Sequence, residues 1–202
     1  MKSIPFAALA LAIALTFSGC LAESTNPLSP PEKAEADNRL AGTWHMKTEK
    51  GEMFVHFIPR EPSRMLAIYV EVEEGKPSAS SYTFFTTTIG GNRFMNLQPE
   101  PMRGEETKDK LKYFFARYEI SKGGELTVWL MNEDAAATEI EAGRVRGEVK
   151  GEGSLKTASL TDTTENLAAF VKGAKLDALF GNRFGTSFQR LAPVQKTSPN
   201  GK

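Results

Sequence analysis

The feature that most constrains this chain is its single cysteine, Cys20, which lies directly behind an apolar leader. Lys2 and the amino terminus supply positive charge, and an uncharged apolar run follows from Ile4 to Phe17. This run of about fourteen residues is shorter than the ~20 that a membrane-spanning helix requires. It is typical of the hydrophobic region of an export signal. We therefore expect residues 1–19 to be a signal peptide that is removed before Cys20.

The residues at the expected cleavage site, Phe17-Ser18-Gly19-Cys20, resemble the lipobox of bacterial lipoproteins. The resemblance implies that Cys20 is the lipid attachment site, with acyl chains on its sulfur and on its amino group. Two or more acyl chains anchor a protein stably to a membrane that it does not span. In this family an Asp after the cysteine marks retention in the inner membrane, and Leu21 stands there instead. The resemblance thus implies the periplasmic face of the outer membrane, if the source is Gram-negative.

The charge and cysteine content of the remaining chain exclude several classes of function. Without residues 1–19 there are 25 − 1 = 24 basic and 25 acidic residues, so the net charge is near −1. This balance provides no field that attracts nucleic acid, and we expect no nucleic-acid partner. With Cys20 lipidated, the fold has no disulfide, no cysteine-ligated metal and no cysteine nucleophile. Its stability must therefore come from its apolar core.

The distribution of turn formers and apolar residues predicts four segments. Residues 1–19 form the signal peptide, and residues 20–38, which contain Pro27, Pro30 and Pro31, are predicted to be a lipidated, disordered tether. Residues 39–191 are long enough for a single β domain with a sizeable core. Residues 192–202 are predicted to be a disordered tail.

A period of two in the apolar residues predicts a mainly β domain. The expected strands are Leu40–Thr48, Glu52–Ile58, Met65–Glu73, Ser80–Ile89, Arg93–Gln98, Tyr113–Ser121, Glu125–Met131, Leu155–Ala158 and Thr186–Leu191. Two helices interrupt them. The segment Glu133–Ala142 is expected to be a short crossover helix, and Thr163–Lys172 a helix that begins after an Asp162 cap, ends at Gly173 and packs on the sheet.

The first hairpin can be assigned a register from its turn. If Lys50-Gly51 is a two-residue turn, Trp44 lies opposite Phe57, and the apolar side chains of both strands share one face. The same register places His45 directly opposite His56 on the other face.

The segment Leu40-Ala41-Gly42-Thr43-Trp44 resembles the Gly-x-Trp opening of lipocalins and related small barrels. In that family a basic residue from the last strand packs over the Trp, which implies that Trp44 and Arg190 form a structural pair at one end of the barrel. The whole chain also resembles a group of uncharacterised lipoproteins with such a β domain, a late strand like Leu155-Lys156-Thr157-Ala158 and a closing helix. The expected fold is an antiparallel, lipocalin-like barrel or half-barrel of about eight to nine strands.

His45 and His56 are the only histidines and the main candidates for a catalytic or metal site. The carboxylate pairs Glu105-Glu106 and Glu139-Glu141 lie in polar segments and are expected to be solvated surface. A cross-strand pair of histidines can bind Zn²⁺ or Cu²⁺ if a third ligand is near. A hydrolase would need one of them as its base, yet no motif that positions a nucleophilic serine occurs in the chain. The bland alternative is two solvent-facing histidines. We expect no cofactor and favour a protein that is not an enzyme.

The aromatic strands lead to a hypothesis about binding. A barrel lumen that is lined by Phe and Met would suit an apolar small molecule, whereas a filled core explains the same residues without a ligand. We therefore predict a membrane-anchored, non-catalytic envelope protein that binds an apolar small molecule. The alternative is an interaction or assembly module for another envelope protein. A cavity of roughly 300 Å³ or more would favour the first, and an exposed apolar patch or a free strand edge the second.

Overall fold

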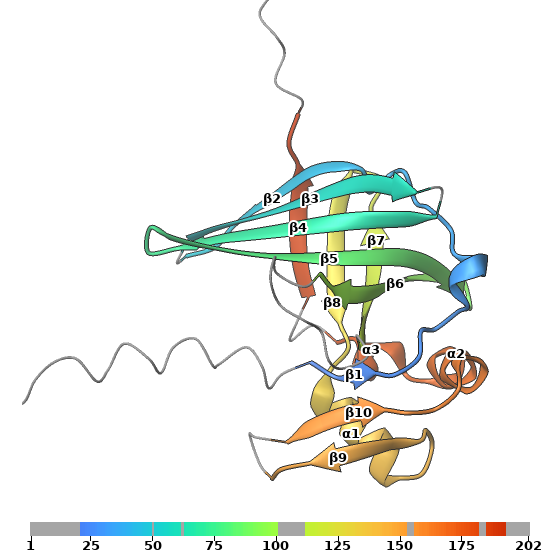
Figure 1. The fold of residues 1–202 in the computed structure, drawn as a ribbon. Coiled ribbons are helices and arrows are strands. Elements are labelled where there is room, and N and C mark those ends of the chain that lie inside the picture. Colours follow the sequence, from blue (N-terminus) through green and yellow to red (C-terminus); the bar gives the residue numbers. More distant parts are fainter. Residues whose placement is uncertain are drawn as a thin grey trace, which may run out of the picture.

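The computed structural model describes residues 21–49, 51–61, 63–100, 112–152, 156–181 and 185–192. Eight antiparallel strands follow one another in the order β6-β5-β4-β3-β2-β11-β8-β7, and a β6–β7 pairing closes the ring (Figure 1). The antiparallel barrel that the sequence predicts is thus confirmed, and it is a closed barrel. Its strands are β2 (Gly42–Lys47), β3 (Gly51–Glu61), β4 (Arg64–Glu73), β5 (Lys76–Ile89), β6 (Asn92–Pro99), β7 (Tyr113–Ile120), β8 (Glu125–Leu130) and β11 (Gly185–Arg190).

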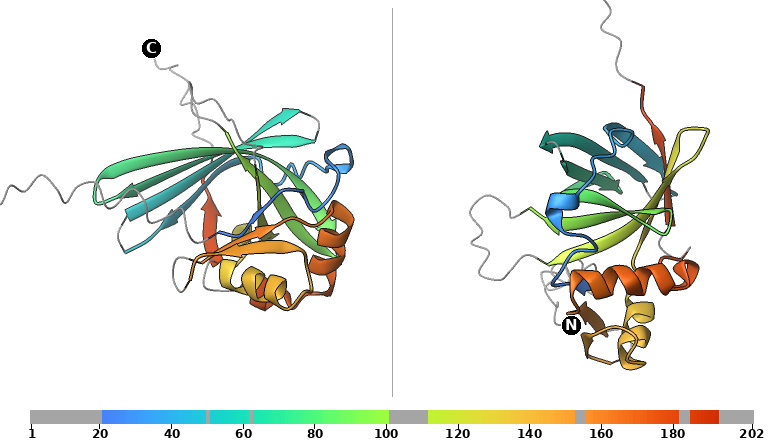
Figure 2. Two further views of the ribbon diagram at one scale, coloured as in Figure 1. Left: turned by 60° about the horizontal axis from the view of Figure 1, so that its bottom comes forward. Right: turned by 90° about the vertical axis from the view of Figure 1, so that its right-hand side faces the viewer.

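A small lobe lies below the barrel in Figure 1 and covers one side of its outer wall (Figure 2). It contains the helices α1 (Glu133–Glu141), α2 (Thr164–Gly173) and α3 (Leu176–Leu179) and the hairpin of β9 (Gly147–Lys150) and β10 (Thr157–Leu160). A two-residue strand, β1 (Glu23–Ser24), joins this hairpin to the barrel, because it pairs with β7 on one side and with β10 on the other. One 3₁₀ turn, η2 (Pro31–Lys33), follows β1.

Two hydrophobic cores correspond to these two parts. The first fills the barrel, where Trp44, Phe84, Met65, Met95 and Leu126 are almost completely buried. The second lies between the barrel wall and the lobe, and its largest members are Phe94, Phe115, Leu160, Leu167 and Phe180. Phe94 and Phe115 belong to the second core and their neighbours Met95 and Ala116 to the first, because successive side chains of a strand point to opposite faces. This explains why β6 and β7 are apolar on both faces.

The hairpin of β2 and β3 is correct in its faces but wrong in its predicted register. Trp44 pairs with Val55 instead of Phe57, and Phe57 pairs with Gly42. The turn lies one residue earlier than expected, because the Thr48 amide donates to the Gly51 carbonyl oxygen at 2.9 Å and these two residues close the hairpin. A shift of two residues in the pairing keeps every side chain on its face, which is why the apolar pattern could not detect it.

The two predicted helices are present. The side chain of Asn132 caps α1 by accepting from the Ala135 amide at 2.9 Å. The cap of α2 is Thr163, whose hydroxyl accepts from the Asn166 amide, and the prediction of Asp162 as the cap is wrong. Asp162 instead accepts hydrogen bonds from the Arg146 amide and from the Asn166 side chain, at 3.0 and 2.7 Å. Strand β9 was not predicted, because its four residues include two charges and show too little apolar pattern.

The prediction of a disordered tether over residues 20–38 is wrong for the part that the structure describes. Leu28 is only 1% exposed and belongs to the second core, and Glu35 and Thr86 exchange backbone hydrogen bonds of 3.2 and 3.3 Å. The segment is poor in apolar residues, but Ala22 and Leu28 are both buried in the second core. We call residues 21–38 the strap. Prolines are compatible with its extended backbone, because proline has no N–H group that would need a hydrogen-bond partner in a sheet. Cys20, the expected signal peptide and residues 193–202 lie outside the described residues.

None of the described helices has the length and the apolar character that crossing a membrane would require.

Candidate functional site

One end of the barrel is closed by Trp44 and the chain that leads into β2. The Trp44 indole Nε1 donates to the Leu40 carbonyl oxygen at 2.7 Å, and both residues are completely buried. The guanidinium of Arg190, from the last strand, lies 4.2 Å from the centroid of the Trp44 ring. It also donates to the carbonyl oxygens of Arg39 and Ala41. The two residues that the lipocalin resemblance pairs are thus in contact, in a structural role.

Gly42 is required by the same arrangement. Its φ of +121° is a conformation that side chains rarely adopt, and a Cβ atom at this position would lie 3.0 Å from Nη1 of Arg190. Glycine therefore lets the chain turn sharply into β2 under the guanidinium. The Gly-x-Trp sequence is explained by backbone conformation and space.

A buried ionic network, which the sequence analysis missed, lies beside this closed end. Asp37 is 6% exposed and accepts hydrogen bonds from Arg39, from Nη1 of Arg93 at 2.8 Å and from the Tyr118 hydroxyl at 2.9 Å. Burial alone would raise the pKa of Asp37, but the hydrogen bonds from Arg39 and Tyr118 hold it at about 2. Burial raises the pKa of Tyr118 to about 12. The network fastens the N-terminal segment to β6 and β7.

A signal for this network existed in the sequence. Tyr118 and Arg93 occupy inward positions of their strands, where a polar group needs a partner. The partner could not be identified, because Asp37 lay in a segment that was interpreted as a tether.

The two histidines do not form the expected opposed pair. His45 pairs with Phe54, and His56 pairs with Thr43, so the histidines are diagonal neighbours on the outer face of the barrel. The His45 ring stacks on Phe54 with centroids 4.6 Å apart, and its buried Nε2 has no hydrogen-bond partner among the described residues. The nearest carboxylate oxygen, from Glu52, is 3.7 Å from Nε2, which is too long for a hydrogen bond.

This geometry bears on both chemical hypotheses for the histidines. His56 Nδ1 lies 2.8 Å from the Thr43 hydroxyl, which occupies one ring nitrogen. No group of three or more His, Cys, Asp and Glu side chains that could hold a metal ion is found among the described residues. A hydrolase would need a serine or carboxylate within about 3 Å of one imidazole in a cleft. The described contacts supply a threonine for His56 and a more distant glutamate for His45.

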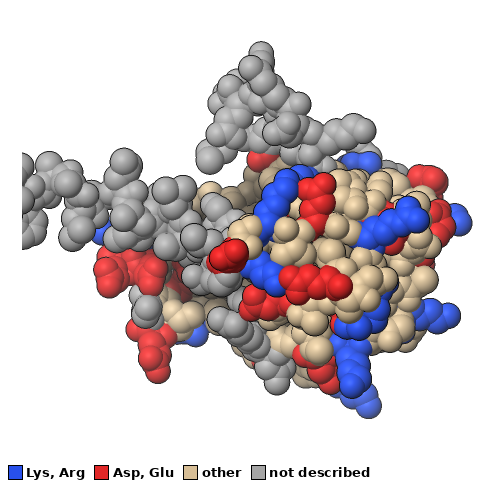
Figure 3. Space-filling model, turned by 90° about the horizontal axis from the view of Figure 1, so that it is seen from below, with Lys and Arg blue, Asp and Glu red and all other residues tan. Residues whose placement is uncertain are grey.

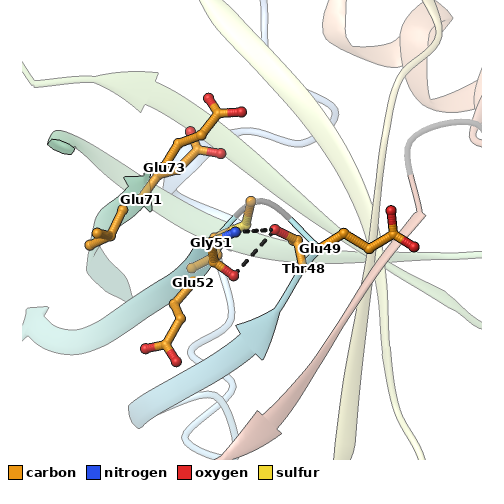
Figure 4. Close-up of a pocket in the computed structure, with 8 residues that line it drawn as sticks. Thr48, Glu49, Gly51, Glu52, Glu71 and Glu73 are labelled. Atoms are coloured by element: carbon orange, nitrogen blue, oxygen red, sulfur yellow. Dashed lines mark hydrogen bonds between the residues drawn. The ribbon is translucent and has the colours of Figure 1, made fainter. Parts of the chain in front are cut away.

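A recess with a volume of about 360 Å³ lies at the ends of the β2–β3 and β4–β5 hairpins. We call it the acidic recess. Met53 and Val72 contribute apolar atoms, but four carboxylates also line it, those of Glu49, Glu52, Glu71 and Glu73. Figure 4 shows that Glu71 and Glu73 lie side by side, whereas Glu49 and Glu52 point away from them. The volume lies in the range of ligand pockets, whereas a lining of four carboxylates does not suit the apolar ligand that the sequence suggested.

A second recess, of about 430 Å³, is open and lies at the outer surface of β4 and β5. Leu66, Ile68 and Ala79 line it together with serines and the ion pair of Arg60 and Glu100, whose atoms are 3.3 Å apart. The interior of the barrel is filled by the large side chains of the first core. An apolar ligand inside the barrel would have to displace them.

The outer faces of β3 and β4 form an apolar surface, which we call the wall. Val55 and Phe57 of β3, with Met65 and Ala67 of β4, point into the barrel, so the intervening residues point outward. The wall comprises Phe54, Ile58, Leu66, Ile68, Val70 and Val72. Phe54 pairs with Val70 and Ile58 with Leu66, whereas His56 lies opposite Ile68 and Glu52 opposite Val72. Ile58 is 43% exposed, the largest exposure of any large apolar side chain in the described part of the chain.

The wall differs from the opposite side of the barrel in what covers it. The outward residues Phe94 and Phe115 of β6 and β7 are buried under the lobe. No described helix or strand lies over β3 and β4 in Figure 1 or in either view of Figure 2. Near the turns of the two hairpins, Glu52 borders the wall as the cross-strand neighbour of Val72. Glu71 and Glu73 alternate with the wall residues of β4 and therefore project from the opposite face of that strand.

The lobe presents a different surface. Positive and negative side chains are interspersed over the underside of the molecule (Figure 3). Several of its cations are paired: Lys150 with Glu148 at 3.1 Å and Lys156 with Glu141 at 2.5 Å. Arg144 also pairs with Glu139.

Comparisons with known proteins identify no relative: no protein-family model, curated protein or solved structure matches the chain. What the protein does must therefore be inferred from the geometry above and from the sequence pattern around Cys20.

Proposed function

We propose that the protein is an exported bacterial lipoprotein that is cleaved before Cys20 and anchored by acyl chains on that residue. The support is the apolar leader of residues 1–19 and the lipobox-like sequence that ends at Cys20. In a Gram-negative source, Leu21 after the cysteine favours the periplasmic face of the outer membrane.

We further propose that the barrel is a non-catalytic binding module for another envelope protein. The observation that carries this proposal is the wall, over which no described helix or strand lies. Of its six apolar side chains, Ile58 is exposed, Phe54, Ile68, Val70 and Val72 are half-buried, and Leu66 is buried. Exposed apolar patches of this kind mark interaction surfaces, because soluble proteins rarely leave them uncovered. The opposite wall of the same barrel illustrates the alternative, since there the lobe buries the outward phenylalanines.

The charges at the end of the wall specify the partner's chemistry. Glu49, Glu52, Glu71 and Glu73 lie around the hairpin ends. Among the described residues, Lys47 forms an ion pair with Glu52 of this group at 3.4 Å, and Nε2 of His45 lies 3.7 Å from the same carboxylate. The acidic side chains therefore outnumber the cations beside them. A partner surface that is apolar at its centre and bordered by Lys or Arg on one side would match both features.

A photo-crosslinking amino acid tests this function in the intact envelope. It is placed at Ile58, or at Leu191 as a matched control, because these side chains are 43% and 42% exposed. We expect a defined adduct from position 58 alone, and we expect Val70→Glu to abolish it. The crosslinked peptide of the partner should be apolar with a basic flank. Equal adducts from both positions, or an adduct that V70E does not affect, would contradict the proposal.

Binding of an apolar small molecule remains a second proposal. It is supported by half-buried side chains that belong to the first core near the hairpin ends: Met46, Met53, Tyr69 and Tyr82. Native mass spectrometry of protein from membranes, without delipidation, tests this hypothesis and the lipid anchor together. A bound mass that survives removal of the acylated N-terminal peptide would favour a carrier.

A further inference from the structure

The described chain is part of the fold from its first residue. Leu21 forms an antiparallel bridge with Asn132. The next residues enter β1, where Ala22 and Ser24 are 2% and 0% exposed. Phe114 of β7 pairs with Glu23 on one edge and with Leu97 of β6 on the other. Thus β1 occupies the edge of β7 opposite β6, inside a continuous sheet.

The contacts continue without a break beyond β1. The Thr25 amide donates to the Leu160 carbonyl oxygen at 3.0 Å, and the Asn26 side chain donates to the Asp162 carbonyl oxygen at 2.8 Å. The Leu28 amide then donates to the buried side chain of Asn96 at 2.7 Å. Releasing any part of this segment as a spacer would break β1 out of the sheet and expose Leu28. The described chain therefore contains no flexible linker between residue 21 and the barrel.

We infer that the domain is held directly at the lipid headgroups, with the side of the lobe where β1 begins facing the membrane. This inference rests on the proposed lipoprotein function. After cleavage before Cys20, a single residue precedes the folded chain, and consecutive Cα atoms are only about 3.8 Å apart. The acyl chains fix Cys20 at the interface, so Leu21 and its neighbours must lie within a few ångströms of it.

The strand register identifies the residues on this side. In the parallel pairing of β1 and β10, Glu23 lies beside Ser159, which places Leu21 level with Thr157. Thr157 pairs with Lys150 at the end of β9. Adjacent strands are about 4.8 Å apart, so Lys150 lies roughly 10 Å from Leu21 across two strand spacings. Its side chain is 77% exposed and is available to the headgroups.

The helix α2 lies on the opposite side of the molecule. In Figure 1 and in the left view of Figure 2, β1 begins on the left and α2 is on the right. The ends of the hairpins β2–β3 and β4–β5 project to the left in both views. A partner that is bound beside these acidic hairpin ends would therefore also lie close to the membrane. The paired cations of the lobe provide no strong attraction for anionic lipid, so the acyl anchor must supply the affinity.

Fluorescence quenching in vesicles tests this orientation. Since Cys20 is the only cysteine and its thiol is acylated, Lys150→Cys and Lys172→Cys each introduce one labelling site. Both lysines are exposed, and Lys172 is in α2 on the far side. The acylated full-length protein is reconstituted in vesicles of phosphatidylethanolamine and phosphatidylglycerol that contain nitroxide-labelled lipid. We expect several-fold stronger quenching at position 150 than at position 172.

A linker variant separates this inference from the proposed anchor. An insertion of twenty Gly and Ser residues between Cys20 and Leu21 adds a flexible spacer of about 25 Å, which should remove most of the difference between the two labels. Equal quenching in the protein without the insertion, or no effect of the insertion, would overturn the direct seating. Failure of the protein to float with vesicles, or the absence of an acyl mass on Cys20, would overturn the lipoprotein function instead.

Discussion

Arg190 lies over the face of Trp44, with its guanidinium carbon 4.2 Å from the ring centroid, although the two residues are at opposite ends of the folded chain. The contact fastens the last strand to the first strand of the barrel, where the described ladder between β11 and β2 consists of two residue pairs, Gln189–His45 and Arg190–Trp44. Because this ladder is short, the stability of the junction between β11 and β2, which we call the seam, depends on side-chain contacts. It is also where the Leu40 and Trp44 plug closes the barrel.

Replacing Arg190 should therefore weaken the seam. The variant Arg190→Met retains an apolar stem over Trp44 but loses the cation–π contact and the hydrogen bonds to the Arg39 and Ala41 carbonyl oxygens. We expect the free energy of unfolding to fall by about 1–2 kcal/mol. Urea unfolding that is followed by tryptophan fluorescence measures this. The neighbouring exposed Gln189, changed to Met, is the control and should alter stability by less than ~0.5 kcal/mol. Equal effects of both variants would argue against a specific role for the guanidinium.

Gly42→Ala should also destabilise the barrel. The added Cβ would force a residue with a side chain to adopt a φ of +121° and would approach Arg190 Nη1 to 3.0 Å. We expect a loss of about 2 kcal/mol or more in the free energy of unfolding. Gly75→Ala provides the comparison, because Gly75 has a φ of +76° and a Cβ added there would meet no atom within 4 Å. A Gly75 variant that is as destabilised as the Gly42 variant would show that backbone strain alone explains the effect.

The barrel could be predicted because its pattern is local. The strands from β2 to β8 are runs rich in apolar, aromatic and β-branched residues, and glycines such as Gly75, Gly90 and Gly124 stand with positive φ at the turns between them. The Trp44–Arg190 contact could be expected only from the family resemblance. The register of the first hairpin was wrong because Trp44 keeps its face in either register.

The N-terminal segment could not be predicted, because its contacts are long-range. Leu28 meets a buried Asn96, and Asp37 meets Arg93 and Tyr118, all far away in the sequence. Few apolar residues and several prolines are typical of a disordered linker, and they are equally compatible with a strap that another surface orders. Only the complementary polar residues on β6 and β7 distinguish the two, and they cannot be matched to partners without the fold.

Leu28→Ala tests whether the strap contributes to stability. Leu28 is 1% exposed within the second core, so its truncation leaves a cavity, and we expect a loss of about 2–4 kcal/mol. Leu191→Ala is the matched control, because that side chain is 42% exposed. Chemical unfolding of both variants provides the comparison. A Leu28 variant as stable as the control would mean that residues 21–38 are a tether after all.

The network around Asp37 predicts how stability depends on acid. The pKa of Asp37 is lowered from its ordinary value of 3.8 to about 2, so the folded state favours the carboxylate. Its contribution to stability is fully present above the unfolded value of 3.8 and is lost as the pH falls toward about 2. The gap between the two pKa values corresponds to roughly 2 kcal/mol. The variant Asp37→Asn should therefore be less stable than wild type at pH 7 and should lose less stability between pH 5 and pH 2.

Urea midpoints at pH 7, 5, 4, 3 and 2 measure this difference. Asp177→Asn is the control, because the Asp177 side chain is 99% exposed and lies 3.5 Å from Arg117. All other carboxylates are shared by the two variants, so the difference between their pH profiles isolates Asp37. We expect the Asp177 variant to follow the wild-type profile and the Asp37 variant to be flatter by roughly 2 kcal/mol. Parallel profiles for the two variants would mean that Arg39, Arg93 and Tyr118 do not hold Asp37 in its charged form.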